Sequence, residues 1–109
     1  MFEYSVKQGD TAPDLEVVLR DEAKRKGIDL EHADRVDFIM KLVGEQDQLF
    51  QRPVTIVNEK GGRVRYSWQA GDTDVPGLYD SEFLIVWETG AMQRVPNEEY
   101  FHVRIEPSL

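Results

Sequence analysis

The sequence contains no cysteine, so a disulfide framework, a zinc–thiolate site and a thiol nucleophile are excluded. The absence of cysteine also fits a reducing compartment. No apolar run approaches the roughly 18 residues of a membrane-spanning helix. Residues 1–10 lack the basic and apolar regions of a signal peptide, and we therefore expect a chain that is cytosolic when made.

Basic residues are few: 13 of them stand against 21 acids, which gives a formal net charge of −8. Binding to nucleic acid is driven largely by neutralising phosphates with cations, so this balance argues against a nucleic-acid partner. Residues 20–27, RDEAKRKG, are the local exception, because four bases are interleaved with two acids. No aromatic residue lies among them to stack on a base, and we interpret this segment as a solvated loop or a short helical turn.

Helical periodicity is almost missing, whereas the strand period of two recurs through the chain. Apolar and polar residues alternate in seven or eight short runs, most clearly in residues 2–6, 15–19, 36–42, 64–68, 79–87 and 101–105. Turns rich in Gly or Asp separate most of these runs. The pattern predicts an all-β fold, an antiparallel β-sandwich of about seven to eight strands, and the length predicts a single domain over 1–109.

Turn chemistry places two hairpins. The glycine-rich turn between Val54–Asn58 and Arg63–Trp68 predicts that these two runs pair. A second hairpin is predicted in residues 86–95, with a Thr-Gly pair near its tip. A helix fits only residues 21–33, and Gly27 interrupts it, so we expect a loop with at most a single turn there.

Residues 71–83, GDTDVPGLYDSEF, join an acidic turn to an alternating run. Asp72 and Asp74 can accept backbone N–H groups in an Asx-type turn. Pro76 fixes its own φ, and Gly77 permits a backbone conformation closed to other residues. We interpret these four residues as the structural motif of a corner between two sheets.

Tyr79 follows this turn at the start of a predicted strand. In immunoglobulin-type sandwiches a tyrosine near the start of a late strand bonds back to the backbone and pins the corner between the sheets. Tyr79 therefore points to an immunoglobulin-like sandwich, in which its ring is buried and its hydroxyl finds a partner. Without a disulfide, the core is expected to rely on the packing of Phe38, Trp68, Phe83 and Trp87.

Calcium is the alternative for the acidic turn. Asp10, Asp72 and Asp74, with backbone carbonyls, could supply the oxygen ligands that this ion prefers. Their spacing does not match the twelve-residue EF-hand loop, because no glutamate stands where the bidentate ligand belongs. Aspartates in turns are more often turn-formers than ligands, so we expect no metal and no cofactor.

Catalytic motifs are also missing. His32 and His102 lie in different parts of the chain, and we interpret each as a surface residue. No nucleophile elbow, zinc-protease, Walker A or dinucleotide fingerprint occurs. The acids in GEQDQ and NEEY could be paired for acid–base work, but acids are abundant enough here for such pairs to arise by chance. We therefore expect a protein that is not an enzyme.

The order of four segments resembles a known family. Residues 2–15 read FEYSVKQGDTAPDL, residues 29–40 read DLEHADRVDFIM, and residues 94–105 read RVPNEEYFHVRI. Residues 61–83, GGRVRYSWQAGDTDVPGLYDSEF, contain the most specific part, which is 64–83. This order is similar to the immunoglobulin-like domain of bacteriophage virion proteins, such as the N-terminal domain of baseplate upper proteins.

The resemblance implies a structural role, as an adaptor or decoration module of a phage or prophage baseplate or tail. It implies other virion proteins, or further copies of this chain, as partners, with no nucleic acid and no membrane. The implied location is the phage virion, after a period in the bacterial cytoplasm before assembly. On this resemblance residues 10–15 open the domain, residues 72–79 form the corner and Trp68 fills the core.

Such a module would act through edge-strand pairing or a side-chain patch. Four apolar residues lie off the core-facing parity, which indicates either two partly covered sheet faces or a partner surface. They are Val18, Ile39, Leu84 and Val86. The alternative function is a carbohydrate-binding module of a tail or host-surface protein, with exposed aromatic residues as a stacking platform. Its candidates are Tyr66, Trp68, Trp87 and Tyr100, of which all but Tyr100 lie on the core-facing parity.

Overall fold

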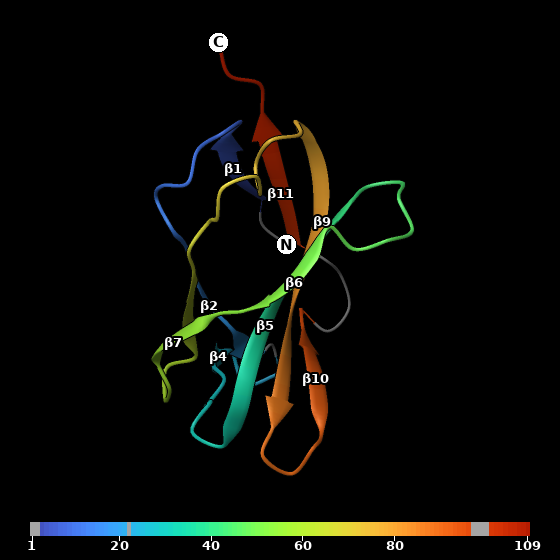
Figure 1. Cartoon of the computed structure of the whole chain (residues 1–109). Coiled ribbons are helices and arrows are strands. Elements are labelled where there is room, and N and C mark those ends of the chain that lie inside the picture. The colour runs from blue at the N-terminus through green and yellow to red at the C-terminus, as the bar shows by residue number, and fades with distance from the viewer. Residues whose placement is uncertain (1–2, 22, 97–100) are drawn as a thin grey trace.

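The structure, a computed structural model, describes residues 3–21, 23–96 and 101–109. These residues form strands and turns only, and no helix among them is long and apolar enough to span a membrane (Figure 1). The strands are β1 (Glu3–Lys7), β2 (Leu15–Val18), β3 (Arg20–Asp21), β4 (Lys26–Gly27), β5 (Ala33–Leu42), β6 (Phe50–Pro53), β7 (Thr55–Asn58), β8 (Arg63–Tyr66), β9 (Gly77–Trp87), β10 (Met92–Val95) and β11 (Phe101–Glu106). The fold is all-β, as the alternating pattern predicted.

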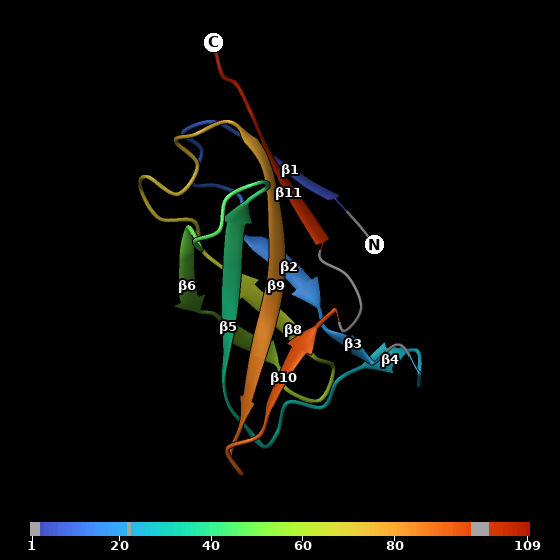
Figure 2. The ribbon, with the colours of Figure 1, turned by 90° about the vertical axis from the view of Figure 1, so that its right-hand side faces the viewer.

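The larger sheet has the strand order β1-β11-β9-β5-β6, and β10 pairs with the far end of β9. β5 pairs with β9 along almost all of its length. On the other side of β9, residues 77–81 pair with β11 and residues 83–86 pair with β10, so β10 and β11 lie end to end (Figure 2). The sheet is mixed and not purely antiparallel as predicted, because β1 and β11 run parallel. These two strands come from opposite ends of the chain, so no hairpin sets their relative direction.

The smaller sheet has the order β2-β8-β7, and β3 pairs with β4 in a separate short hairpin. Both predicted hairpins are present, because β7 pairs with β8 and β9 pairs with β10. The run from residue 50 to residue 58 is divided at Val54, where β6 in the larger sheet gives way to β7 in the smaller one. The described residues therefore form eleven strands, more than the seven or eight that alternation alone indicated.

In the basic segment, residues 20–21 and 26–27 pair as β3 and β4, in place of the expected loop or helical turn. Asp21 caps its turn, because its Oδ1 accepts hydrogen bonds from the backbone N–H groups of Ala23 (3.0 Å) and Lys24 (3.2 Å). Arg25 donates its backbone N–H to the Asp21 carbonyl at 2.7 Å and has a positive φ of 55°. The aspartate thus offers the backbone a tight turn that competes with helix formation.

One hydrophobic cluster draws side chains from both sheets, an arrangement compatible with a β-sandwich. Phe38 on β5 is fully buried within it. Its ring lies 5.0–6.0 Å, between centroids, from the rings of Phe50, Tyr66, Trp68, Phe83 and Phe101. Three of the four predicted core aromatics are therefore buried, and the fourth, Trp87, is partly buried against the same cluster.

The apolar residues off the core-facing parity do not form an exposed patch. Because successive side chains of a strand point to opposite faces, Ile39 and Leu84 lie on the face of the sheet away from Phe38. Both are nevertheless buried there, at 6% and 5% exposure. Val18 and Val86 are half-buried. Of the two interpretations open from the sequence, partial cover of both sheet faces is the one that these exposures favour.

Glycines let the β3–β4 hairpin pack closely on the turn between β7 and β8. A Cβ built on Gly27 would lie 1.9 Å from the carbonyl oxygen of Gly61. A Cβ on Gly62 would lie 2.7 Å from the carbonyl oxygens of both Leu19 and Ile28, and Gly62 has a positive φ of 74°. A backbone hydrogen bond from Leu19 N to the Gly62 carbonyl crosses the same contact at 2.8 Å, and one from Ile28 N to the Leu19 carbonyl, also at 2.8 Å, joins the two arms at the base of the hairpin.

This contact gives a test with a matched control. Gly9 has a similar positive φ of 86°, but a Cβ built on it meets nothing within 4 Å. We expect Gly9→Ala to cost about 1 kcal/mol of unfolding free energy from backbone strain alone. Gly62→Ala should cost at least about 2 kcal/mol more, because overpacking against rigid backbone adds to that strain. Urea denaturation of both variants measures the difference, and equal losses would refute the close contact.

Candidate functional site

Asp72, in the acidic turn, is buried and accepts hydrogen bonds from three groups. Its Oδ1 accepts from Nη1 of Arg52 on β6. Its Oδ2 accepts from the Tyr66 hydroxyl on β8 at 2.6 Å and from the backbone N–H of Gln69 at 2.8 Å. Since β6 belongs to the larger sheet and β8 to the smaller one, this carboxylate connects the two sheets through side chains.

Arg52 and Tyr66 also interact with each other. Arg52 Nη1 lies 2.9 Å from the Tyr66 hydroxyl oxygen, and the guanidinium carbon lies 4.5 Å from the centroid of the Phe50 ring. Burial, assisted by the hydrogen bond to Asp72, raises the pKa of Tyr66 to about 12. Tyr66 therefore stays protonated and remains a donor to the carboxylate at neutral pH.

Tyr79 makes the contact that the sequence predicted for a corner tyrosine. Its buried hydroxyl donates to the backbone carbonyl of Val75, four residues upstream, at 2.7 Å. Burial raises the pKa of Tyr79. Thr73, also buried, donates its hydroxyl to the Asp10 carbonyl at 2.9 Å, so the turn is fastened to the N-terminal region as well.

The other residues of the predicted motif contribute less. Asp74 is exposed, and its backbone carbonyl, not its carboxylate, accepts a hydrogen bond from Gln8 Nε2 at 2.9 Å. Pro76 is exposed too. Gly77 has a positive φ of 153°, and a Cβ on it would lie 3.0 Å from Cδ1 of Leu42. Trp68 is 5% exposed and lies in the core.

The three aspartates proposed as calcium ligands do not form a ligand set. Both oxygens of Asp72 already accept hydrogen bonds, one of them from a guanidinium that neutralises the carboxylate. Asp10 and Asp74 are exposed. Within residues 3–21, 23–96 and 101–109, no group of three or more His, Asp or Glu side chains is arranged to hold a metal ion.

The two histidines lie in separate places, and each is next to a different carboxylate. His32 Nδ1 is 3.7 Å from Glu88 Oε2, and both side chains are exposed. His102 Nε2 is 3.1 Å from Asp80 Oδ1 on the neighbouring strand β9. The acids of GEQDQ lie in the exposed β5–β6 connection, and NEEY falls outside the described residues.

The aromatic residues considered as a sugar platform do not share one surface. Tyr66 and Trp68 are buried in the core, at 2% and 5% exposure, and pack edge to face at 5.3 Å between ring centroids. Trp87 is only partly buried, and Tyr100 lies outside the described residues. A platform built on Trp68 and Trp87 together is therefore ruled out by the burial of Trp68.

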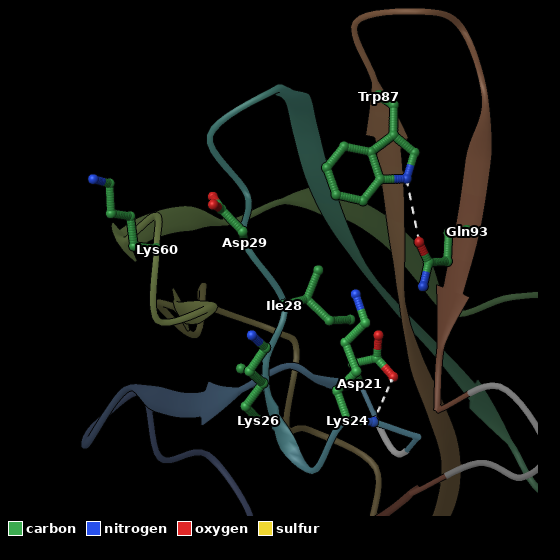
Figure 3. A pocket seen from close by; sticks show the side chains of 9 residues that line it. Asp21, Lys24, Lys26, Ile28, Asp29, Lys60, Trp87 and Gln93 are labelled. Carbon is green, nitrogen blue, oxygen red and sulfur yellow. Dashed lines mark hydrogen bonds between the residues drawn. The ribbon is translucent and has the colours of Figure 1, made fainter.

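Trp87 instead forms part of a hollow of about 410 Å³ between the β3–β4 hairpin and the β9–β10 hairpin (Figure 3). Its indole N–H donates to Gln93 Oε1 at 3.3 Å. Three lysines reach the same hollow from two other segments of the chain. They are Lys24, Lys26 and Lys60.

The sequence contains only a partial signal for this hollow. Lys24 and Lys26 belong to the basic segment 20–27, whose composition is typical of a solvated loop. The hollow is also lined by Lys60 from the turn after β7 and by Trp87 and Gln93 from β9–β10, all more than 30 residues away from that segment along the chain. Only the pairing of strands brings them together.

The chain matches no protein-family model and no curated protein. Two features of the structure are candidates for a functional role: the turn whose Asp72 connects the two sheets, and the lysine-lined hollow beside Trp87.

Asp72 and Asp74 form a matched pair for testing the turn. Asp72→Ala leaves the Arg52 cation and two further donors without their acceptor, and breaking such a pair costs about 3 kcal/mol of unfolding free energy or more. Asp74→Ala removes an exposed carboxylate and should stay within about 0.5 kcal/mol of the parent. Chemical denaturation at pH 7 compares them; similar losses would mean that Asp72 does not hold the sheets.

Alkaline pH tests the environment of Tyr66. Its folded pKa, about 12, exceeds its ordinary value of 10.0, so the folded state retains a proton that the unfolded state loses. The free energy of unfolding should therefore fall between pH 10 and pH 12, by up to about 1.4 kcal/mol per pH unit for this group. Tyr66→Phe should be less stable at pH 7 but show a shallower fall over that range. An unchanged slope would contradict the raised pKa.

Proposed function

We propose that the chain is a non-enzymatic structural module of a bacteriophage or prophage particle, an adaptor or decoration domain of a baseplate or tail. The observation that carries this proposal is the use made of residues 64–83, the part most similar to phage virion domains. Trp68 packs in the core, Asp72 joins the two sheets, and Tyr79 fastens the corner. The residues that carry the resemblance therefore make structural contacts, as that resemblance implies.

We assign the fold, within this proposal, to the immunoglobulin-like class. In that class strands A, B, E and D form one sheet, and strands C, F and G form the other. The order β2-β8-β7 corresponds to B, E and D, and β5-β9-β11 corresponds to C, F and G. Tyr79 lies near the start of β9, the strand that corresponds to F. The continuous core cluster supports a single domain over 1–109.

The core differs from that of antibody domains because it contains no disulfide between the sheets. Ser81 stands two residues after Tyr79, where antibody domains carry the second cysteine, and it is 1% exposed. Across from it in the larger sheet lie Met40 on β5 and Phe101 on β11. Aromatic and aliphatic packing around Phe38 takes the place of the covalent link between sheets.

We place the contact with a neighbouring particle protein at the edge strand β6 and the loop before it. Among the described strands β6 pairs with β5 alone, so its other side is an edge at which a further strand could pair. The loop of residues 43–49 extends away from the sheets (Figure 1). Val43 and Leu49, at its two ends, are 47% and 48% exposed, which gives the edge an apolar margin.

Particles made by the bacterial strain that encodes this chain provide the test. Purified by density gradient and analysed by mass spectrometry, they should contain the chain in a fixed ratio to other tail proteins. The double variant Val43→Ser/Leu49→Ser should lower its incorporation at least about tenfold, because the contact loses buried apolar area. Val57→Ser, which changes a 43% exposed valine on β7, serves as the control. A chain found only in the soluble cell fraction would refute the proposal.

A further inference from the structure

We propose that the hollow between the β3–β4 and β9–β10 hairpins is a binding site for an acidic saccharide, with one carboxylate-bearing sugar ring seated against Trp87. Its volume of about 410 Å³ falls within the range of small-molecule sites. The inference rests on the residues of the hollow and is independent of any role in a particle.

Among the residues that the structure describes, the lysines of the hollow form no ion pair. In the described part of the chain, every ion pair uses an arginine or a histidine, and Lys24, Lys26 and Lys60 take part in none. The chain as a whole carries a formal net charge of −8 and only five lysines. Three of those five at one hollow concentrate positive charge where a ligand anion would find it.

Two aspartates limit how much negative charge this ligand can carry. Asp21 and Asp29 also line the hollow, so its described lining carries a formal charge of one positive unit, and this excess is supplied by Lys60, which extends outward. Each already uses its Oδ1 as a turn acceptor: Asp21 for the Ala23 and Lys24 amides, and Asp29 for the amide of Glu31 at 2.9 Å. The remaining carboxylate oxygens are acceptors suited to sugar hydroxyls. A ring with a single carboxylate matches this balance better than a phosphate with two charges.

Trp87 and Gln93 supply the uncharged part of the site. The indole N–H is a donor only, so the hydrogen bond to Gln93 fixes the amide with its oxygen toward the indole and its NH₂ group free to donate. Figure 3 shows the Lys24 side chain extending toward these two residues and Ile28 beside it, whereas Lys60 extends away. The site therefore offers an aromatic face, an amide donor and an ammonium group in one place.

Contacts within the protein itself hold both walls of the hollow. One wall, the β3–β4 hairpin, is held on the β7–β8 turn by the Gly27–Gly61 contact and by the hydrogen bond from Leu19 N to the Gly62 carbonyl. The other is the β9–β10 hairpin, closed by a hydrogen bond from Trp87 N to the Ala91 carbonyl at 2.8 Å. A site that is already formed loses less conformational entropy when it binds.

Nuclear magnetic resonance of the full chain tests the site, with oligogalacturonate as the probe and the neutral galactose oligomer of equal length as its control. The chain has two tryptophans, so the indole signals give an internal comparison. Oligogalacturonate should shift the indole N–H signal of Trp87 and the side-chain amide of Gln93, while Trp68, in the core, stays unchanged. The neutral oligomer should shift none of them at the same concentration.

Charge variants sharpen the test. Lys24→Gln/Lys26→Gln should weaken binding of oligogalacturonate by about tenfold, as expected for loss of charge-assisted hydrogen bonds. Lys7→Gln/Lys41→Gln removes the same charge outside the hollow and should change it less than about twofold at moderate salt, where distant exposed charges are screened. Gln93→Ala should also weaken binding and is expected to fold, because Gln93 is exposed.

Three results would overturn the inference. Equal shifts from the neutral oligomer would show that charge plays no part. Equal weakening by the two lysine pairs would show that only the net charge of the chain matters. Tighter binding of a nucleoside monophosphate than of galacturonate, with the same signals moving, would make the hollow a phosphate site.

Discussion

The buried carboxylate of Asp72 is the interaction on which the arrangement of the two sheets most depends. It receives a guanidinium from β6, a hydroxyl from β8 and a backbone amide from its own turn, so three separate segments meet at one side chain. A buried charge is tolerated only when it is paired and hydrogen-bonded. Here that requirement fixes the distance between the sheets at one end, while the rings around Phe38 fill the space between them.

Much of this fold could be predicted from alternation and turns. The core-facing parity of β5, β8, β9 and β11 placed Phe38, Trp68 and Phe83 in the interior, and two hairpins followed from glycine-rich turns. Local patterns do not encode which distant strands pair. For that reason the parallel contact of β1 with β11 and the division of the 50–58 run between two sheets were missed. Arg52, the partner of Asp72, lay outside the predicted site for the same reason: the two are 20 residues apart.

The candidate sites show the same division between local and distant information. Asp72 and Tyr79 could be named from the turn because most of their hydrogen bonds lie within ten residues, and Gly77 could be named from its backbone freedom. The hollow at Trp87 could not, because its lysines come from β3–β4 and from the turn after β7, while Trp87 and Gln93 belong to a third segment. Its one visible sign was a cluster of bases in an acidic chain, which by itself is typical of a solvated loop.

The ends of the molecule are not equivalent. The fold is elongated, 44 Å along its longest axis, and the chain's C-terminal end and the β9–β10 hairpin with its hollow lie toward opposite poles (Figures 1 and 2). Any attachment through the C-terminal pole would therefore leave the half of the domain that carries the lysines facing away from the point of attachment. β9 runs along the length of the molecule, with the corner tyrosine near one end and Trp87 at the other. This single strand therefore sets the distance and direction between the corner and the hollow.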